Sequence, residues 1–208
     1  GGGVRTYPVG MRYGLSIDAG GIRGLAALVF LIEFVQDRRT IDPEFNLNRF
    51  FDVYTGSSVG GLLCAVLCTN PALFDENVNE IVMDVLGSIF TLDNPSILSA
   101  ILSNRYTHDG IRNVFRKYAS DVKLCSIAST NKRVVIPVYD ITNHAPVVFD
   151  SDNVHEDHKH VTLQDMVLAT CSFPGMFPPH QIQSTFYIDG GLVQTNPVLL
   201  AASEQKYD

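Results

Sequence analysis

Several features that mark large classes of protein are missing from this sequence of 208 residues. It has no tract of five or more basic side chains, and its formal net charge is −7, which argues against a nucleic-acid partner. The same charge argues against electrostatic adhesion to anionic membranes, although an apolar patch can still bind an interface. The longest apolar run, 25–35, contains Glu33 and is too short to span a bilayer.

Cysteine is scarce, and no Cys-x-x-Cys spacing occurs among Cys64, Cys68, Cys125 and Cys171. The first two lie one turn apart in an apolar helical pattern, which is typical of core thiols in a reducing compartment. We therefore expect a protein that is cytoplasmic or peripheral to membranes. No Asp/Asn-rich loop has calcium-site spacing, and the charged run 155–160 is more simply a solvated loop than a metal site. No metal or cofactor is expected.

The residues that are present favour one globular domain. Apolar residues make up 46% of the chain and charged residues 18%. We interpret 1–12 as an N-terminal extension or an engineered chain end, and 13–208 as a single domain. Strand-like runs at 13–18 and 51–55 alternate with apolar helical patterns at 22–38 and 58–69. This order predicts parallel strands with helices on both faces, and the helix at 22–38 is expected to be buried because it is apolar on nearly all sides.

Beyond residue 70 the pattern becomes more varied. Periodicity and turn residues predict helices at 74–90, 111–118, 163–170 and 197–205, and strands at 133–140, 146–149 and 185–188. The amphipathic helix at 74–90 is typical of core packing, and it is also where the acyl-chain wall of a lipid-handling enzyme would lie.

A Gly-x-Ser-x-Gly pattern at 56–60 joins the second strand to the second helix. A serine on such a sharp turn has its hydroxyl exposed at a helix N-terminus, and the flanking glycines allow strand and helix to approach closely. Ser58 is therefore a candidate nucleophile. Taken alone, the pattern is equally consistent with an ordinary glycine-rich turn.

A glycine-rich cluster at 18–24 follows the first strand and opens the first helix. Unpaired backbone N–H groups at such a place favour negative charge, so the cluster suits either a dinucleotide phosphate or the oxyanion of acyl transfer. It also suits simple tight packing. A dinucleotide site needs a second strand ending in an acid about 20 residues on. Asp37 has that spacing but lies in the helix pattern, and no second strand follows that helix before residue 51.

A serine nucleophile needs a base, and Asp189, at the end of the last strand, is the candidate. None of the six histidines follows Asp189, which excludes a Ser–Asp–His order that uses it. A triad of Ser58 with Asp140 and His180 stays formally possible. A desolvated carboxylate has a raised pKa and is a better proton acceptor, so a Ser–Asp dyad is the sharper hypothesis.

Together, these motifs resemble the patatin-like phospholipase family. The glycine-rich cluster 18–25, the pattern at 56–60 and the Asp-Gly-Gly at 189–191 occur in that family's order, and 172–179 and the Asn-Pro at 196–197 match two softer features. The resemblance covers about 13–205. It implies a three-layer α/β/α catalytic domain with a mostly parallel central sheet, a variant of the α/β-hydrolase plan.

The resemblance also implies residue roles. Ser58 would be the nucleophile, Asp189 the base, and the backbone amides of Gly20 and Gly21 the oxyanion hole. Supporting motif positions would be Ala19, Arg23, Gly24, Gly56, Gly60, Gly190 and Gly191, where Arg23 either steadies the loop or meets a phosphate head group. Ala19 departs from the family, which most often has glycine there. Alanine is costly if that position needs φ > 0 and harmless if it is extended.

The expected function is metal-independent hydrolysis of ester-linked fatty acids, of the phospholipase A or lysophospholipase type, through an acyl-enzyme. The expected partner is a phospholipid or other acyl lipid at a peripheral membrane or micelle interface. An acyltransferase that uses the same dyad, and a non-catalytic lipid-binding module of the same fold, are the alternatives. The sequence gives no oligomeric state.

Overall fold

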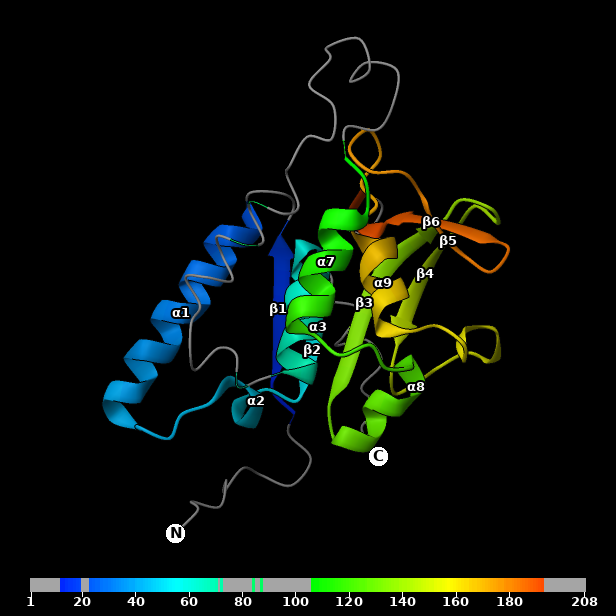
Figure 1. Cartoon of the computed structure of the whole chain (residues 1–208). Coiled ribbons are helices and arrows are strands. Elements are labelled where there is room, and N and C mark those ends of the chain that lie inside the picture. The colour runs from blue at the N-terminus through cyan, green and yellow to red at the C-terminus, as the bar shows by residue number, and fades with distance from the viewer. Residues whose placement is uncertain are drawn as a thin grey trace.

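The computed structural model of this chain describes residues 12–19, 23–70, 72, 84, 87 and 106–192. These residues form a mixed sheet with helices on both sides (Figure 1). The strands are β1 (Gly14–Ala19), β2 (Val53–Ser58), β3 (Arg133–Asp140), β4 (Ala145–Asp150), β5 (His180–Ile182) and β6 (Thr185–Asp189). The helices are α1 (Arg23–Ile41), α2 (Leu47–Phe50), α3 (Val59–Thr69), α7 (Asp109–Tyr118), α8 (Leu124–Ile127) and α9 (Leu163–Thr170).

The strand order is β1-β2-β3-β6-β5, and β4 pairs with the other edge of β3. The first three strands are parallel, as the alternation of strands and helices predicts. Strands β4 and β6 run antiparallel to β3, which makes the sheet mixed beyond its parallel core. The short strand β5 and the helix α8 were not predicted, because three or four residues show no clear periodicity.

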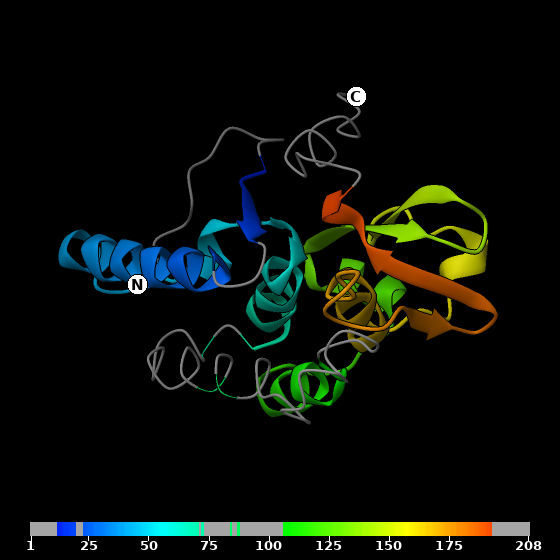
Figure 2. The ribbon, with the colours of Figure 1, turned by 90° about the horizontal axis from the view of Figure 1, so that it is seen from above.

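One face of the sheet is covered at its centre by α3, α9 and α7. Seen from above, α3 and α9 lie against the sheet and α7 lies outside them (Figure 2), and the three helices contact one another. Every residue of α3 from Val59 to Leu67 is buried, including Cys64, as expected of a core thiol. Burial raises the pKa of Cys68 to about 11, which keeps this half-buried thiol protonated at neutral pH.

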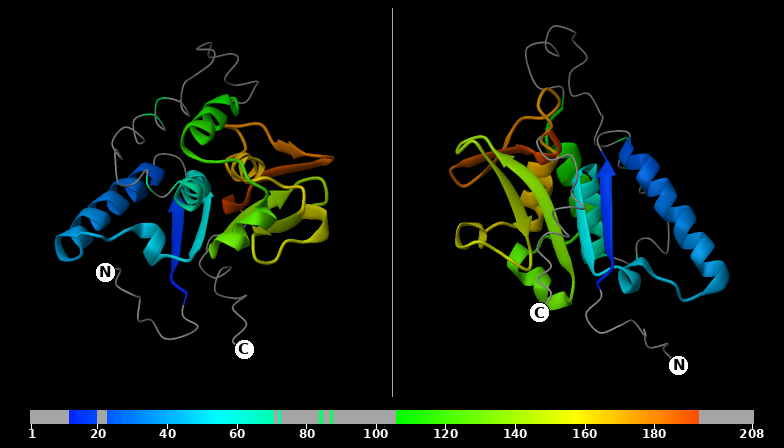
Figure 3. Two further views of the ribbon diagram at one scale, coloured as in Figure 1. Left: turned by 60° about the horizontal axis from the view of Figure 1, so that its bottom comes forward. Right: turned by 180° about the vertical axis from the view of Figure 1, so that it is seen from behind.

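The prediction that the first helix is buried is wrong. Helix α1 buries Leu31 and Val35, but Val29 is 45% exposed and Phe30 66% exposed. Figure 3 shows α1 at the outer edge of the sheet beside β1, and among the described elements it packs against β1 and α3. An apolar composition on all sides of a helix shows what it can bury, and the position in the fold decides what it does bury.

The predicted helices at 74–90 and 197–205 lie outside the described residues, apart from isolated positions. Within the part of the chain that is described, no helix combines the length and the apolarity needed to cross a membrane.

Candidate active site

Ser58 ends β2 and directly precedes α3, with φ 55° and ψ −129°. This is a region that glycine adopts freely and that costs another residue on the order of 1–3 kcal/mol. Serine before a helix usually caps it through the side-chain oxygen, but the Ser58 side chain makes no capping hydrogen bond to α3. The strained turn therefore directs the hydroxyl away from the helix it precedes.

The turn is possible because α3 starts almost in contact with β1. A Cβ atom placed on Gly60 would lie 2.0 Å from the carbonyl oxygen of Ile17, and one on Gly56 would lie 2.8 Å from the same oxygen. Both positions are thus restricted to glycine by backbone atoms that have no room to move. The close approach places the positive end of the α3 dipole beside Ser58, where it favours negative charge.

Strand pairing brings Asp189 close to Ser58. Val138 pairs with Val147 of β4 on one edge and with Asp189 of β6 on the other. Strand β2 pairs with that second edge too, up to Thr55 opposite Val135, so three further residues carry it to the level of Val138. Strands β2 and β6 therefore run toward each other along one edge of β3 and meet at Ser58 and Asp189.

The Asp189 carboxylate is nearly enclosed, with the residue only 3% exposed, and it has two donors. The backbone N–H of Gly191 donates to Oδ1 at 2.8 Å, and the Ser58 hydroxyl donates to the carboxylate. Burial raises the pKa of Asp189, and the two hydrogen bonds offset part of that rise. Gly190 permits this turn, since a Cβ there would lie 2.5 Å from the carbonyl carbon of Pro137.

The sequence around this geometry is similar to that of a known protein family. The sequence matches the model of the patatin-like phospholipase family over residues 15–202. The chain belongs to the patatin-like phospholipase family.

Curated patatin-like relatives extend the match across the chain. Patatin-like protein 2 of Oryza sativa subsp. indica is 30% identical over 215 residues, which cover 91% of this chain and 52% of the relative. A protein named "Probable inactive patatin-like protein 9", from Arabidopsis thaliana, is 27% identical over 91% of this chain and 53% of its own length. The chain therefore spans about half the length of these relatives. Among solved structures, VipD from Legionella pneumophila aligns with 88% of this chain and 46% of its own, at 12% identity and a TM-score of 0.49.

The glycine-rich motif of this patatin-like chain is described in part. Ala19 is the last residue of β1 and pairs in register with Ser58, so its backbone is part of an extended strand. Arg23 and Gly24 open α1. The predicted oxyanion residues Gly20 and Gly21 lie outside the described residues.

The alternative triad is not assembled. The Asp140 carboxylate accepts hydrogen bonds from Thr142 and Asn143 in the turn after β3, while His180 Nε2 lies 2.9 Å from Oδ1 of Asp165. The two residues are thus engaged in separate contacts, neither of which includes Ser58.

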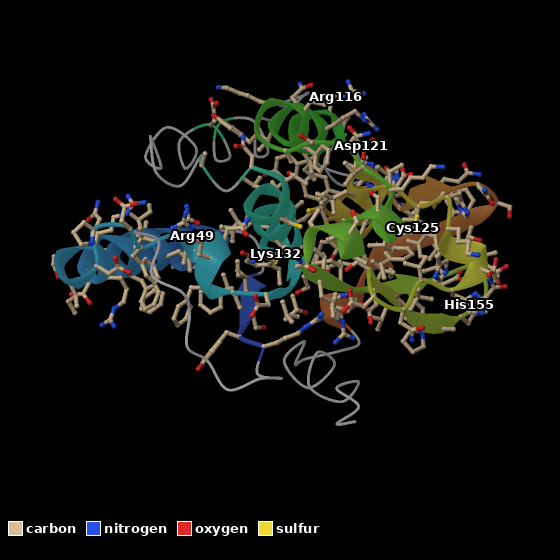
Figure 4. All side chains as sticks on the ribbon, turned by 90° about the horizontal axis from the view of Figure 1, so that it is seen from below. Arg49, Arg116, Asp121, Cys125, Lys132 and His155 are labelled. Atoms are coloured by element: carbon tan, nitrogen blue, oxygen red, sulfur yellow. The ribbon has the colours of Figure 1, made fainter. Side chains whose placement is uncertain are left out.

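The charged run 155–160 lies on the surface. His155 projects at the outer rim of the molecule (Figure 4), and Glu156 pairs with Lys159 at 2.6 Å. Within the described residues, no group of three or more histidine, cysteine, aspartate or glutamate side chains is arranged to hold a metal ion.

Two residues that hold the backbones of Ser58 and Asp189 were not predicted from the sequence. The hydroxyl of Thr170 accepts the backbone N–H of Ser58 at 3.0 Å, and the backbone carbonyl of Ser172 accepts the N–H of Asp189, also at 3.0 Å. A signal was present, because Thr170 directly follows the apolar run 166–169 and Ser172 comes two residues later, and buried hydroxyls of this kind need specific partners. That signal alone does not say which partners they find.

Proposed function

We propose that this chain is a serine lipid acyl hydrolase of the phospholipase A or lysophospholipase type, in which Ser58 is the nucleophile and Asp189 the base. The observation that carries the proposal is the hydroxyl of a strained Ser58 hydrogen bonded to a buried carboxylate. Strain of this kind persists only where the surrounding structure maintains it, and it gathers at catalytic sites. Membership in the patatin-like family supplies the class of substrate, an acyl lipid presented at a membrane or micelle interface.

The reaction follows from the hydrogen bond between the two side chains. Ser58 Oγ attacks the ester carbonyl carbon while Asp189 accepts its proton, and the positive end of α3 favours the negative charge that develops. The amides of Gly20 and Gly21 are proposed as the oxyanion donors. Collapse of the tetrahedral intermediate breaks the ester C–O bond, and the alkoxide leaves with the proton from Asp189. Water then attacks the acyl-enzyme and Asp189 takes the water proton. The bond between the acyl carbon and Ser58 Oγ breaks, Asp189 returns the proton to Oγ, and a free fatty acid leaves.

Burial of Asp189 serves this chemistry directly. A carboxylate with a raised pKa binds the serine proton more strongly than a solvated one. The proton transfer from Ser58 therefore contributes less to the activation barrier. The two donors that reach it favour its ionised form, because each hydrogen bond lowers the pKa that burial raises.

Labelling by a fluorophosphonate probe tests the nucleophile. We expect the wild type to be labelled at Ser58, Ser58→Ala to be unlabelled, and Asp189→Asn to be labelled at least about 100-fold more slowly, since general base catalysis contributes 10²–10⁴-fold. Ser129→Ala, which removes an exposed hydroxyl far along the chain from the dyad, is the control and should react like the wild type. Equal labelling of wild type and Ser58→Ala would refute the assignment.

Product analysis then separates the alternatives. Phosphatidylcholine micelles with and without an added alcohol acceptor are incubated with the protein and read by mass spectrometry. Free fatty acid in both samples supports a hydrolase, while an acyl ester formed only with the acceptor identifies a transferase. Absence of both products, in a folded protein that is also unlabelled, identifies a non-catalytic module.

A further inference from the structure

One short segment at the end of α9 holds the backbone of both members of the dyad. Thr170 Oγ1 accepts the amide proton of Ser58 at 3.0 Å, and two residues later the Ser172 carbonyl accepts the amide proton of Asp189 at 3.0 Å. Ser58 and Asp189 are separated by more than 100 residues in sequence. Segment 170–172 therefore links the two catalytic positions more directly than the strands that carry them.

The Thr170 hydroxyl is fully buried and has a defined direction. Its single proton goes to the carbonyl oxygen of Pro137 at 3.3 Å, which leaves a lone pair directed at the amide of Ser58. Pro137 precedes Val138, the residue at whose level β2 and β6 meet, and its carbonyl lies against Gly190. The hydroxyl thus connects the nucleophile turn to the strand that pairs with the base.

The other end of the segment, Ser172, is hydrogen bonded to His108, the residue directly before α7. Ser172 Oγ donates to the carbonyl of Leu168 at 2.7 Å, so it accepts from Nε2 of His108, 2.9 Å away. The His108 ring is buried and stacks on Phe177 with ring centroids 6.1 Å apart. Burial, followed by electrostatic interaction with His180 and Arg112, lowers the pKa of His108 to about 4, so the ring is a neutral donor at physiological pH.

We propose that Thr170 is a positioning residue for the reaction of Ser58. Its hydroxyl fixes the peptide plane before Ser58, holds φ in the positive region and so sets the distance from Ser58 Oγ to the Asp189 carboxylate. The role rests on the proposed function for its catalytic consequence, but the hydrogen bond to the Ser58 amide can be tested without any turnover.

Thr170→Val tests the role, because valine keeps the shape of threonine and removes the hydroxyl. We expect kcat and the rate constant of fluorophosphonate labelling to fall about 10- to 100-fold, the size of effect that a small misplacement of a reacting group produces. The KM should change less than about threefold, since the residue acts on the chemical step and not on lipid binding. Thr170→Ser restores the hydroxyl and should stay within about threefold of the wild type in all three quantities.

Thr162→Val is the matched control. Thr162 caps the opposite end of α9 through a hydrogen bond from the Asp165 amide, so its loss destabilises the same helix at the end away from the dyad. We expect a lower midpoint of thermal unfolding and an unchanged labelling rate. A loss in Thr162→Val equal to that in Thr170→Val would mean that helix stability, and not the Thr170 hydroxyl, controls reactivity, and would overturn the proposal.

Amide hydrogen exchange at Ser58, followed by NMR, separates this proposal from the proposed function. The wild-type amide should be strongly protected, and Thr170→Val should exchange it at least tenfold faster. Suppose the wild type is not labelled and does not hydrolyse lipid, but the protection of the Ser58 amide is lost in Thr170→Val. The proposed function is then wrong, and the hydrogen bond from Ser58 to Thr170 is confirmed. An unprotected Ser58 amide in wild type, or a folded Thr170→Val with wild-type labelling, overturns the positioning role, and the wild-type measurement holds even if the variant does not fold.

Discussion

Ser58 combines a backbone conformation that serine disfavours with a side chain that makes no bond to the helix it precedes. These two facts have one explanation. The turn raises the free energy of the folded chain locally, and in return the hydroxyl points at Asp189, which no relaxed helix cap would allow. At the scale of a single residue, stability is therefore opposed to the reactivity that we propose for Ser58.

This opposition predicts an order of stability among variants of Ser58. We expect Ser58→Gly to have a free energy of unfolding about 1 kcal/mol higher than Ser58→Ala, because glycine relieves a strain of about 1–3 kcal/mol and costs about 0.5–1 kcal/mol of extra chain entropy. Both variants lose the hydroxyl and its bond to Asp189, so their comparison isolates the backbone. Urea denaturation followed by circular dichroism measures the difference, and an alanine variant as stable as the glycine variant would show that the turn is unstrained.

At the scale of elements, the site depends on the contact between α3 and β1. The helix begins so close to the strand that only a hydrogen atom fits between Gly60 and the carbonyl of Ile17. This spacing permits the sharp turn at Ser58 and brings the N-terminus of α3 toward the reacting atoms.

Gly60→Ala should therefore damage the whole domain. Its Cβ would lie 2.0 Å from a backbone oxygen, and we expect a loss of about 3 kcal/mol or more in the free energy of unfolding, at the upper end for overpacking. Gly14→Ala in β1 is the control, since its nearest neighbours would be 3.8 Å away and its loss should stay below about 1 kcal/mol. Equal denaturation midpoints for the two variants would contradict the close approach.

At the scale of the whole molecule, β3 organises the site by pairing with β2 and β6 along one edge. The strands carry Ser58 and Asp189 to a common level, where the surrounding core excludes water from the carboxylate. That desolvation raises the pKa of Asp189, so it favours proton transfer and also destabilises the ionised folded protein.

Asp189→Asn should therefore be more stable than the wild type at neutral pH. Because the folded pKa is raised, the folded protein holds the Asp189 proton more tightly than the unfolded chain does. Wild-type stability then falls as pH rises from the unfolded pKa through the folded one, and asparagine lacks this loss. Thermal unfolding at pH 4 and pH 7 should show an advantage for Asp189→Asn that is larger at pH 7.

Asp37→Asn controls for the removal of one negative charge from a chain of net charge −7, because Asp37 is exposed. Its difference from the wild type should be small and should vary little between the two pH values. A stability gain for Asp189→Asn that is equally large at pH 4 would contradict a raised pKa.

Local patterns in the sequence were sufficient for the elements around the site. Alternation and turn residues located β1 to β4, β6, α3 and α9, since each of these is long enough to show its own periodicity. Periodicity did not predict β5 and α8, which are too short to show it. It also gave the wrong burial for α1, because that burial depends on the place of the helix at the edge of the sheet. Ser58 and Asp189 could be named as candidates because glycine-flanked serine turns and glycine-flanked carboxylates have local signatures, and their catalytic roles stay predictions.

By itself, then, the sequence determined which residues are candidates for the reaction and that no histidine follows Asp189 to complete a triad. Only the tertiary structure decided that β2 and β6 meet on one edge of β3, that His180 bonds Asp165, and that Thr170 holds the Ser58 amide. The physical reason is that strain, desolvation and hydrogen-bond partnership arise between segments distant in sequence. A local pattern indicates which secondary structure and which chemistry a residue is suited to. The packing of the whole chain decides which other residues it contacts.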